Sequence, residues 1–156
     1  MIRLNRLTDY GVVVMSQMAA RDDLRSAQQI SDSTAIPLPT VSKILNALSH
    51  ADLVVAQRGA SGGYRLVRPA ERIAVSEVIQ ALEGPIALTA CVEGAESHCD
   101  VERLCPMSGG WNKVNTAIRD ALATVSLADM AGIPEAFLVP RDSGVESEKN
   151  TEITNK

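Results

Sequence analysis

The hydrophobic positions of the first twenty residues recur at the spacing of one helix face. A helix over residues 7–20 would place on that face Val12, Met15 and Ala19. Thr8 is the expected N-cap, and Asp9 falls in the first turn, where a carboxylate complements the helix dipole. The apolar run is too short for a signal peptide or a membrane span, so we expect a cytoplasmic chain with no membrane partner.

A second and a third helix are predicted on either side of a turn that contains two prolines. Ser26 and Gln29 form a capping-box pattern that begins a short helix over residues 27–35. The sequence IPLP at 36–39 interrupts any helix, because proline removes backbone donors and restricts the residue before it. A third helix is expected over residues 39–50, with proline at its first position.

The third helix has two clearly different faces. Its apolar stripe consists of Val41, Ile44, Leu45 and Leu48. At about 100° per residue, the opposite face carries Pro39, Ser42, Lys43, Asn46 and His50. This small polar face with one cation is suited to contact a ligand outside the domain.

Two short β-rich runs follow, LVVAQ and YRLV, separated by the glycine-rich sequence RGASGG. Such a pattern predicts a β-hairpin, with Tyr64 packed against the core. Two helices, a tight turn and a hairpin make a winged helix-turn-helix. The predicted fold class is therefore mainly α with a small β-hairpin wing.

The second half of the chain predicts two more helices. The first ends at Gly84–Pro85 and is marked by Val75, Val78, Ile79 and Leu82. The second is a long amphipathic helix over residues 110–130, with a stripe of Trp111, Val114, Ile118, Ala121, Leu122 and Val125. Because little of the chain is left to cover that stripe, we interpret it as a dimerisation helix; the alternative is packing within one chain.

Four regions follow from these elements. They are a winged helix-turn-helix domain (1–85), a cysteine-rich loop (86–109), a dimerisation helix with its end (110–139) and a polar, disordered tail (140–156).

Charge is distributed unevenly along the chain, whose net charge is -4. Residues 1–75 hold nine Lys or Arg against six Asp or Glu, whereas residues 76–156 hold six against thirteen. A basic first half is what phosphate contact requires, and the acidic half can face away from DNA.

The expected DNA contacts come from the third helix and the wing. Thr40, Ser42 and Lys43 lie near the start of the helix that would enter the major groove. Arg58 lies at the mouth of the wing, where it could enter the adjacent minor groove, and Gly62 and Gly63 belong to the same basic turn. Taken singly, these residues could equally be a solvated face and ordinary turn glycines; their order along the chain is the more specific signal.

Three cysteines, Cys91, Cys99 and Cys105, lie in one polar stretch between the last two helices. Reduced thiols clustered in this way more often bind a metal or a cluster than form a disulfide framework. Structural zinc sites usually contain a CxxC knuckle, which this loop lacks. Wider spacing in a glycine-containing loop favours an iron-sulfur cluster, of 2Fe-2S or 4Fe-4S type, modestly over zinc.

The wing RGASGGYRL, the opening MIRLNRLTDYG and the three cysteines resemble the bacterial iron-sulfur-cluster-dependent winged-helix regulators, the family of IscR, NsrR and the SUF-system assembly regulator. The resemblance covers residues 1 to about 130. It implies a homodimeric transcription factor, commonly a repressor, that binds a palindromic promoter site. It also implies an iron-sulfur cluster held by the three cysteines and one further ligand. The state of that cluster then changes the affinity of the protein for DNA.

The fourth ligand is where the chain departs from part of that family. Members similar to IscR have a histidine three residues after the last cysteine, and Ser108 stands there in this sequence. In the nitric-oxide-sensing members an aspartate of the partner subunit is a ligand, and Asp9 matches its position. Helix-dipole complementation by Asp9 is an equally weighted and compatible interpretation. Weaker candidates are Glu93, Glu96 and His98.

The resemblance, together with the clustered thiols, implies a redox-sensing regulator of iron-sulfur assembly genes of the SUF type. A nitric-oxide-sensing repressor of the same fold is the alternative. Two other classes are an electron carrier or cluster scaffold, which would need no DNA reader, and a DNA-binding protein with structural zinc. We expect no enzymatic activity, because the sequence contains no phosphate loop, nucleophile-base pair or acid pair.

Overall fold

The computed structural model describes residues 3–21, 23–59, 61–95, 99–100, 104–107 and 109–132. Its elements are, in chain order, α1 (Arg6–Ala19), α2 (Ala27–Thr34), α3 (Leu38–His50), β1 (Val54–Gln57), β2 (Gly63–Leu66), a 3-10 turn η1 (Ala70–Arg72), α4 (Val75–Glu83), α5 (Gly110–Ala123) and α6 (Leu127–Met130). The expected fold class, a mainly helical domain with a hairpin wing, is confirmed. The predicted tail at 140–156 lies outside the described residues.

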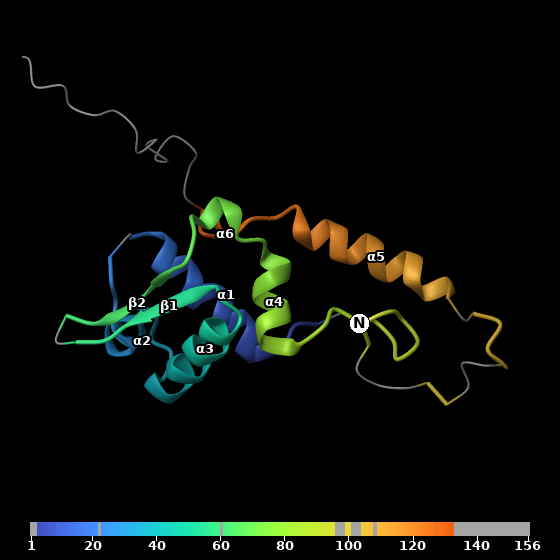
Figure 1. Cartoon of the computed structure of the whole chain (residues 1–156), viewed down its shortest axis with the longest axis horizontal. Coiled ribbons are helices and arrows are strands. Elements are labelled where there is room, and N and C mark those ends of the chain that lie inside the picture. Colours follow the sequence, from blue (N-terminus) through green and yellow to red (C-terminus); the bar gives the residue numbers. More distant parts are fainter. Residues whose placement is uncertain are drawn as a thin grey trace, which may run out of the picture.

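The first four helices, the hairpin, η1 and α6 form a body around one apolar core (Figure 1). Fully buried side chains of the core come from several helices and from β1 and include Met15, Ile30, Ile44, Leu48, Val54 and Leu127. The stripe predicted for the third helix is entirely buried, so the polar face opposite it is turned to solvent. Packing therefore fixes the rotation of α3 about its axis.

The first helix begins one residue earlier than predicted, and its N-cap lies three residues before the predicted one. Its N-cap is Asn5, whose Oδ1 accepts a hydrogen bond from the Thr8 backbone N–H at 2.9 Å. The prediction of Thr8 as N-cap is therefore wrong: this residue lies inside α1 and is buried. Asn5 also donates its backbone N–H to Glu83 Oε1 at 2.9 Å. The start of α1 consequently lies against the end of α4, just before the chain enters the cysteine region.

The second helix begins as expected, with the reciprocal capping box between Ser26 and Gln29. It ends at Ala35, which adopts a left-handed conformation with φ 58°. The chain then passes through Pro37 into α3, whose second residue is Pro39. Helix, turn and helix thus follow one another as the sequence predicts.

The wing is an antiparallel pair in which Val54 faces Leu66 and Gln57 faces Gly63. Tyr64 is half-buried against the core, as expected. It exchanges two backbone hydrogen bonds with Arg25, at 2.8 and 3.0 Å. The hairpin is therefore attached to the segment before α2 as well as to α3.

The predicted single helix over 110–130 is interrupted. Helix α5 ends at Ala123, and Ser126 caps the separate helix α6. Between them, Val125 O accepts from Val75 N at 2.9 Å, and Leu127 N donates to Ile73 O at 2.8 Å. Because these backbone groups bond to the start of α4, they cannot continue a helix, and the chain returns to the body.

Helix α5 extends away from the body (Figure 1). Of the described elements, its main partner is α4. We call α5 together with the cysteine loop (residues 86–109) the arm. Within the described residues, no helix has the length and apolar character needed to cross a membrane.

Candidate nucleic-acid interface and cysteine loop

The exposed face of α3 is the centre of the candidate DNA interface. Ser42, Lys43 and Asn46 are exposed, and Thr40 in the first turn is half-buried. The first turn contains no acidic residue, and Pro37 at its N-cap provides no side-chain hydrogen bond. Pro39 has no backbone N–H, and the Thr40 N–H already donates to the Pro37 carbonyl at 2.8 Å, so the side chains of the exposed face are the main groups that this helix start offers to DNA.

The two wing glycines have a local structural reason. A Cβ on Gly62 would lie 2.4 Å from the Gln57 carbonyl oxygen, and one on Gly63 would lie 2.7 Å from the Arg25 carbonyl carbon. Only glycine permits these close backbone approaches. Gly62 and Gly63 thus shape the wing, while Arg58 before the turn is exposed and free to reach outward.

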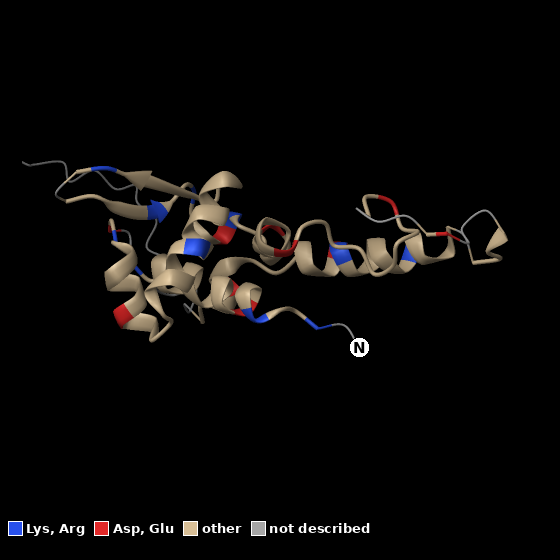
Figure 2. Ribbon diagram, turned by 90° about the horizontal axis from the view of Figure 1, so that it is seen from below, with Lys and Arg blue, Asp and Glu red and all other residues tan. Residues whose placement is uncertain are grey.

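The basic residues of the wing differ in what they contact. Figure 2 shows positive charge on the hairpin, at the end of the molecule away from α5. Arg65 is exposed, opposite Val55 in the register. Arg68 instead forms an ion pair with Glu77 of α4 and donates from Nε to the Arg72 carbonyl at 2.9 Å. Its charge is partly neutralised by Glu77, whereas Arg58 and Arg65 are exposed cations of the wing.

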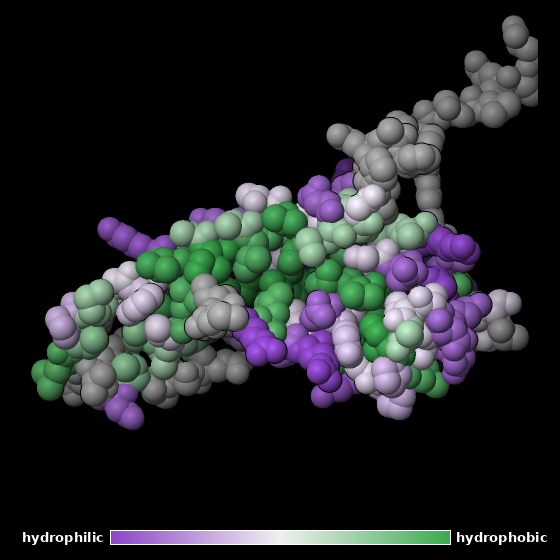
Figure 3. All heavy atoms as spheres, turned by 180° about the vertical axis from the view of Figure 1, so that it is seen from behind, coloured by the Kyte–Doolittle hydropathy of each residue, from purple (hydrophilic) through white to green (hydrophobic). Residues whose placement is uncertain are grey.

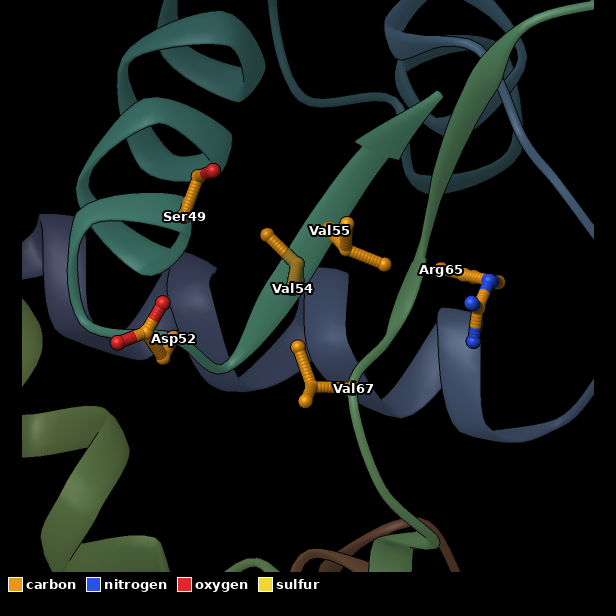
Figure 4. A pocket seen from close by; sticks show the side chains of 6 residues that line it. All are labelled: Ser49, Asp52, Val54, Val55, Arg65 and Val67. Atoms are coloured by element: carbon orange, nitrogen blue, oxygen red, sulfur yellow. The ribbon is translucent and has the colours of Figure 1, made fainter.

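A shallow hollow of about 360 Å³ lies between the end of α3 and the wing (Figure 4). Its lining consists of Ser49, Asp52, Val54, Val55, Arg65 and Val67. Asp52 and Arg65 stand at opposite ends of it, with the valines between them. The hollow separates the α3 side of the interface from the charged edge of the wing.

The three cysteines are free thiols, and each is half-buried. The Cys91 sulfur lies 3.2 Å from the Thr89 hydroxyl oxygen, within hydrogen-bonding distance. Three soft, reduced donors in a polar loop fit the chemistry of an iron-sulfur cluster. In the part of the chain that the structure describes, however, no three Cys, His, Asp or Glu side chains are gathered closely enough to hold a metal ion. A single chain thus contains the three thiol donors, but they do not lie close enough together to form one metal site.

Of the possible fourth ligands, Asp9 and Glu93 are described and exposed. Asp9 lies one turn into α1, on a concave surface that it lines with Arg3, Leu4, Asn5 and Arg6. Glu96, His98 and Ser108 fall outside the described residues. Asp9 therefore faces outward, where a second molecule could reach it.

Sequence reasoning missed two asparagines that attach the cysteine loop to α5. Asn115 Oδ1 accepts from Leu88 N at 3.0 Å, and its Nδ2 donates to Ile86 O at 3.0 Å. Asn112 Oδ1 accepts from Glu93 N at 3.0 Å. The sequence does contain a sign of these contacts, because two asparagines, which are poor helix formers, stand three residues apart inside a predicted helix.

The apolar stripe of α5 is divided between two environments. Ile118 and Leu122 in the second half of α5 are half-buried, whereas Trp111 and Val114 in its first half are 40% and 44% exposed. Viewed from behind, the surface shows a broad apolar band across the middle of the molecule (Figure 3). Large exposed apolar areas of this kind usually mark an interface.

Comparison with known proteins places this architecture in a family. The model of the Rrf2 family, described as an iron-dependent transcriptional regulator, matches residues 4–132. CymR (YrzC), the global cysteine regulator of B. subtilis, is 26% identical, with a TM-score of 0.63 over 84% of this chain and 97% of that one. T. potens IscR is also 26% identical, with a TM-score of 0.62 over 90% and 94%.

A further similar structure is the oxidised form of Staphylococcus aureus CymR, which is 26% identical, with a TM-score of 0.59 over 84% of this chain and 97% of that one. The family match spans the helix-turn-helix, the wing, the cysteine loop and α5. It confirms a DNA-binding transcriptional regulator rather than an enzyme. The chain belongs to the Rrf2 family of winged-helix transcriptional regulators.

Proposed function

We propose that this regulator is a homodimer whose affinity for promoter DNA depends on an iron-sulfur cluster held by Cys91, Cys99 and Cys105. The observation that carries the proposal is the position of three free, half-buried thiols in a loop that is hydrogen-bonded to α5. The same chain exposes a DNA-reading helix at its other end. Sensor and reader are thus two ends of one continuous structure.

DNA binding is assigned to the exposed faces of α3 and the wing. Ser42 and Lys43, with Thr40, would contact base edges or phosphates in the major groove, and Arg58 would follow the adjacent minor groove. Gly62 and Gly63 keep the wing narrow by allowing the close backbone contacts described above. Lys and Arg contacts to phosphate provide much of the affinity and make it sensitive to salt.

Dimerisation is assigned to α5 and the neighbouring apolar surface. Trp111 and Val114 on α5, and Met130 on α6, are between 40% and 53% exposed in the single chain. Covering them with a second copy removes this surface from water, and a two-fold dimer matches a palindromic DNA site. We therefore also propose the division of the chain into a DNA-binding domain, a cysteine loop, a dimerisation region and a tail, with boundaries after residues 85, 109 and 139.

The three cysteines would hold the cluster, which supplies redox-sensitive iron-thiolate bonds between parts of the loop. In the described part of the single chain these thiols are not gathered into one site. Asp9 of the second subunit is the proposed fourth ligand, because it is exposed on a concave surface at the start of α1. Through Asn5 and Glu83 this start is hydrogen-bonded to the end of α4.

For the regulated genes we propose repression of iron-sulfur assembly of the SUF type. A nitric-oxide-sensing repressor is the second candidate, and it is favoured because Asp9 matches the position of the aspartate ligand in the members that it resembles. The two differ in the signal that removes the cluster. Holo protein exposed anaerobically to nitric oxide, and separately to iron chelation, would distinguish them by which treatment changes DNA affinity.

Anaerobic purification of the full chain, followed by native mass spectrometry and absorption spectroscopy, tests the proposal. We expect a coloured dimer containing iron and sulfide, with colour lost in Cys91→Ser, Cys99→Ser and Cys105→Ser. Asp9→Ala should shorten the cluster lifetime while the fold is retained. An unchanged lifetime would leave Asp9 only its helix-dipole role.

Other compositions would overturn the cluster. A colourless protein with stoichiometric zinc would establish a structural metal site, and a metal-free dimer would establish a regulator that responds through its thiols alone. A coloured protein that binds no DNA in either cluster state would instead be an electron carrier or scaffold. DNA binding is measured by fluorescence anisotropy on a labelled promoter fragment with and without the cluster.

A further inference from the structure

Two asparagines of α5 bracket the first cysteine. Asn115 is hydrogen-bonded to the backbone at Ile86 and Leu88, before Cys91, and Asn112 is hydrogen-bonded to the backbone at Glu93, after it. As the loop advances from 86 to 93, its contacts move from Asn115 back to Asn112. The loop therefore runs antiparallel to α5, with Cys91 held between two attachment points.

Both polar atoms of the buried Asn115 amide are hydrogen-bonded in this arrangement. The residue is 3% exposed, and both its carbonyl oxygen and its amide nitrogen bond to loop backbone. A buried amide that lost these partners would bear the cost of an unsatisfied polar group. The loop segment before Cys91 is thus strongly restricted to one position along α5.

Helix stability alone does not account for these two residues. Asparagine is among the poorer helix formers, and α5 contains it at two positions three residues apart. Residues at this spacing share one helix face, which here is the face turned to the loop. The side chains satisfy backbone groups of a loop that has no strand partner.

The thiol itself is held between these points. Cys91 is half-buried, and its sulfur lies 3.2 Å from the Thr89 hydroxyl. Thr89 follows Leu88, whose N–H is bound by Asn115. Fixing the backbone on both sides of the cysteine limits the directions in which its sulfur can point.

The neighbouring face of α5 carries the exposed Trp111 and Val114. The helix that holds Cys91 is thus the helix proposed to contact the second subunit. A change in the loop that pulls on Asn112 or Asn115 acts directly on that helix. This gives the thiol loop a short physical connection to the dimer interface.

We propose that Asn112 and Asn115 are positioning residues for Cys91 and that they couple the state of the thiol loop to α5. The positioning stands on the hydrogen bonds alone, whereas its regulatory consequence rests on the proposed cluster function. Removing either asparagine should release Cys91, and in the holo protein it should destabilise the cluster.

The test uses the full chain with Cys99→Ser and Cys105→Ser, so that Cys91 is the single thiol and no cluster is needed. The rate of alkylation by iodoacetamide is followed by intact-protein mass spectrometry. Asn112→Leu should raise the rate about fivefold, the equivalent of one lost hydrogen bond. Asn112→Asp keeps the acceptor for Glu93 N and should remain within about twofold of the parent.

Asn115→Leu should raise the rate further, because two hydrogen bonds are lost. Asn115→Asp keeps the acceptor for Leu88 N but cannot donate to the Ile86 carbonyl, so its rate should lie between those of the parent and Asn115→Leu. Thr116→Ala, at an exposed position next to Asn115, is the matched control and should leave the rate unchanged. If the Asn115 variants fail to fold, the two Asn112 variants still decide the question.

In the otherwise native chain, Asn112→Leu should shorten the cluster lifetime under chelation about tenfold, as changes beside metal ligands commonly do. A purely structural role would lower the free energy of unfolding without separating Asn112→Leu from Asn112→Asp in alkylation. Equal rates for parent, Asn112→Leu and Asn112→Asp would overturn the positioning role. If the native chain holds no cluster but the alkylation pattern is as expected, the proposed function fails and the positioning survives.

Discussion

The body and the arm of this protein are stabilised by different kinds of interaction. The body buries side chains from several helices and from the hairpin in one core, in which Ile44, Leu45 and Leu48 of α3 are fully inaccessible. The described part of the cysteine loop is attached to α5 by hydrogen bonds from Asn112 and Asn115, and α5 leaves Trp111 and Val114 exposed.

This difference suits a regulator. A body with a single apolar core keeps the proposed DNA-reading face in one shape, because close packing resists small rearrangements. A loop held by a few directional bonds can change its arrangement for much less free energy. The two regions meet at α4, which packs against α5, and at the hydrogen bonds that join Val125 and Leu127 to Val75 and Ile73.

The largest difference between variants of the body and variants of the arm should be in the free energy of unfolding, when a buried side chain is shortened. Leu48→Ala removes a fully buried side chain and should lower the free energy of unfolding by about 3 kcal/mol. Leu104→Ala, at a position 93% exposed in the cysteine loop, should change it by less than about 0.5 kcal/mol. Urea unfolding followed by circular dichroism measures both. Similar losses for the two variants would mean that the arm shares the core.

Sequence periodicity predicted the body well because its elements are set by local patterns and apolar stripes. The stripe of α3 and the capping box of Ser26 and Gln29 both depend on residues within one or two turns. The cap of α1 was misassigned because Asn5 and Thr8 can both cap, and the bond from Asn5 to Glu83 is not visible locally.

The arm was harder to predict because its contacts join residues far apart in the chain. Asn115 bonds to residues 27 and 29 positions away, and Asn112 to one 19 positions away. The capping box of Ser126 and Asp129 was a local signal for a new helix, but the bonds to Ile73 and Val75 that hold the interruption are long-range. The cysteines were recognised from their number and spacing, but neither feature determines how they converge.

A second comparison uses glycines of the two regions. Gly63→Ala would place a Cβ 2.7 Å from the Arg25 backbone and should cost about 1–3 kcal/mol and weaken DNA binding, since the wing must shift. Gly110→Ala at the start of α5 has Met107 Cε at 3.6 Å as its nearest neighbour. It should leave stability unchanged or raise it by up to about 1 kcal/mol. Thermal unfolding with promoter-binding assays tests the pair, and a tolerated Gly63→Ala would contradict the close approach.

Charge removal should distinguish the two regions in DNA binding rather than in stability. Lys43→Ala and Arg58→Ala should each weaken binding and reduce the slope of log affinity against log salt by about 1. Lys113→Ala, on α5, is the matched change in the arm and should alter neither quantity. Anisotropy titrations at several salt concentrations provide the measurement. An unchanged slope in both body variants would refute the assigned surface.

The smallest expected effect concerns the junction at which the arm returns to the body. Hydrogen bonds from the side chain and the backbone N–H of Ser126 lower the pKa of Asp129 below its ordinary value of 3.8. Because the folded-state pKa is the lower one, the stabilisation is present above the ordinary value and is lost as pH falls through the folded-state pKa.

Asp129→Asn should therefore be less stable than the native chain near neutral pH, and the difference should disappear in acid. Ser126→Ala should move the pKa of Asp129 back toward its ordinary value, which carboxyl NMR titration would detect. A stability difference between the native chain and Asp129→Asn that persists unchanged below the folded-state pKa would show that Asp129 acts through packing instead of its charge. In that case the capped turn at Ser126 would fix the end of the arm independently of pH.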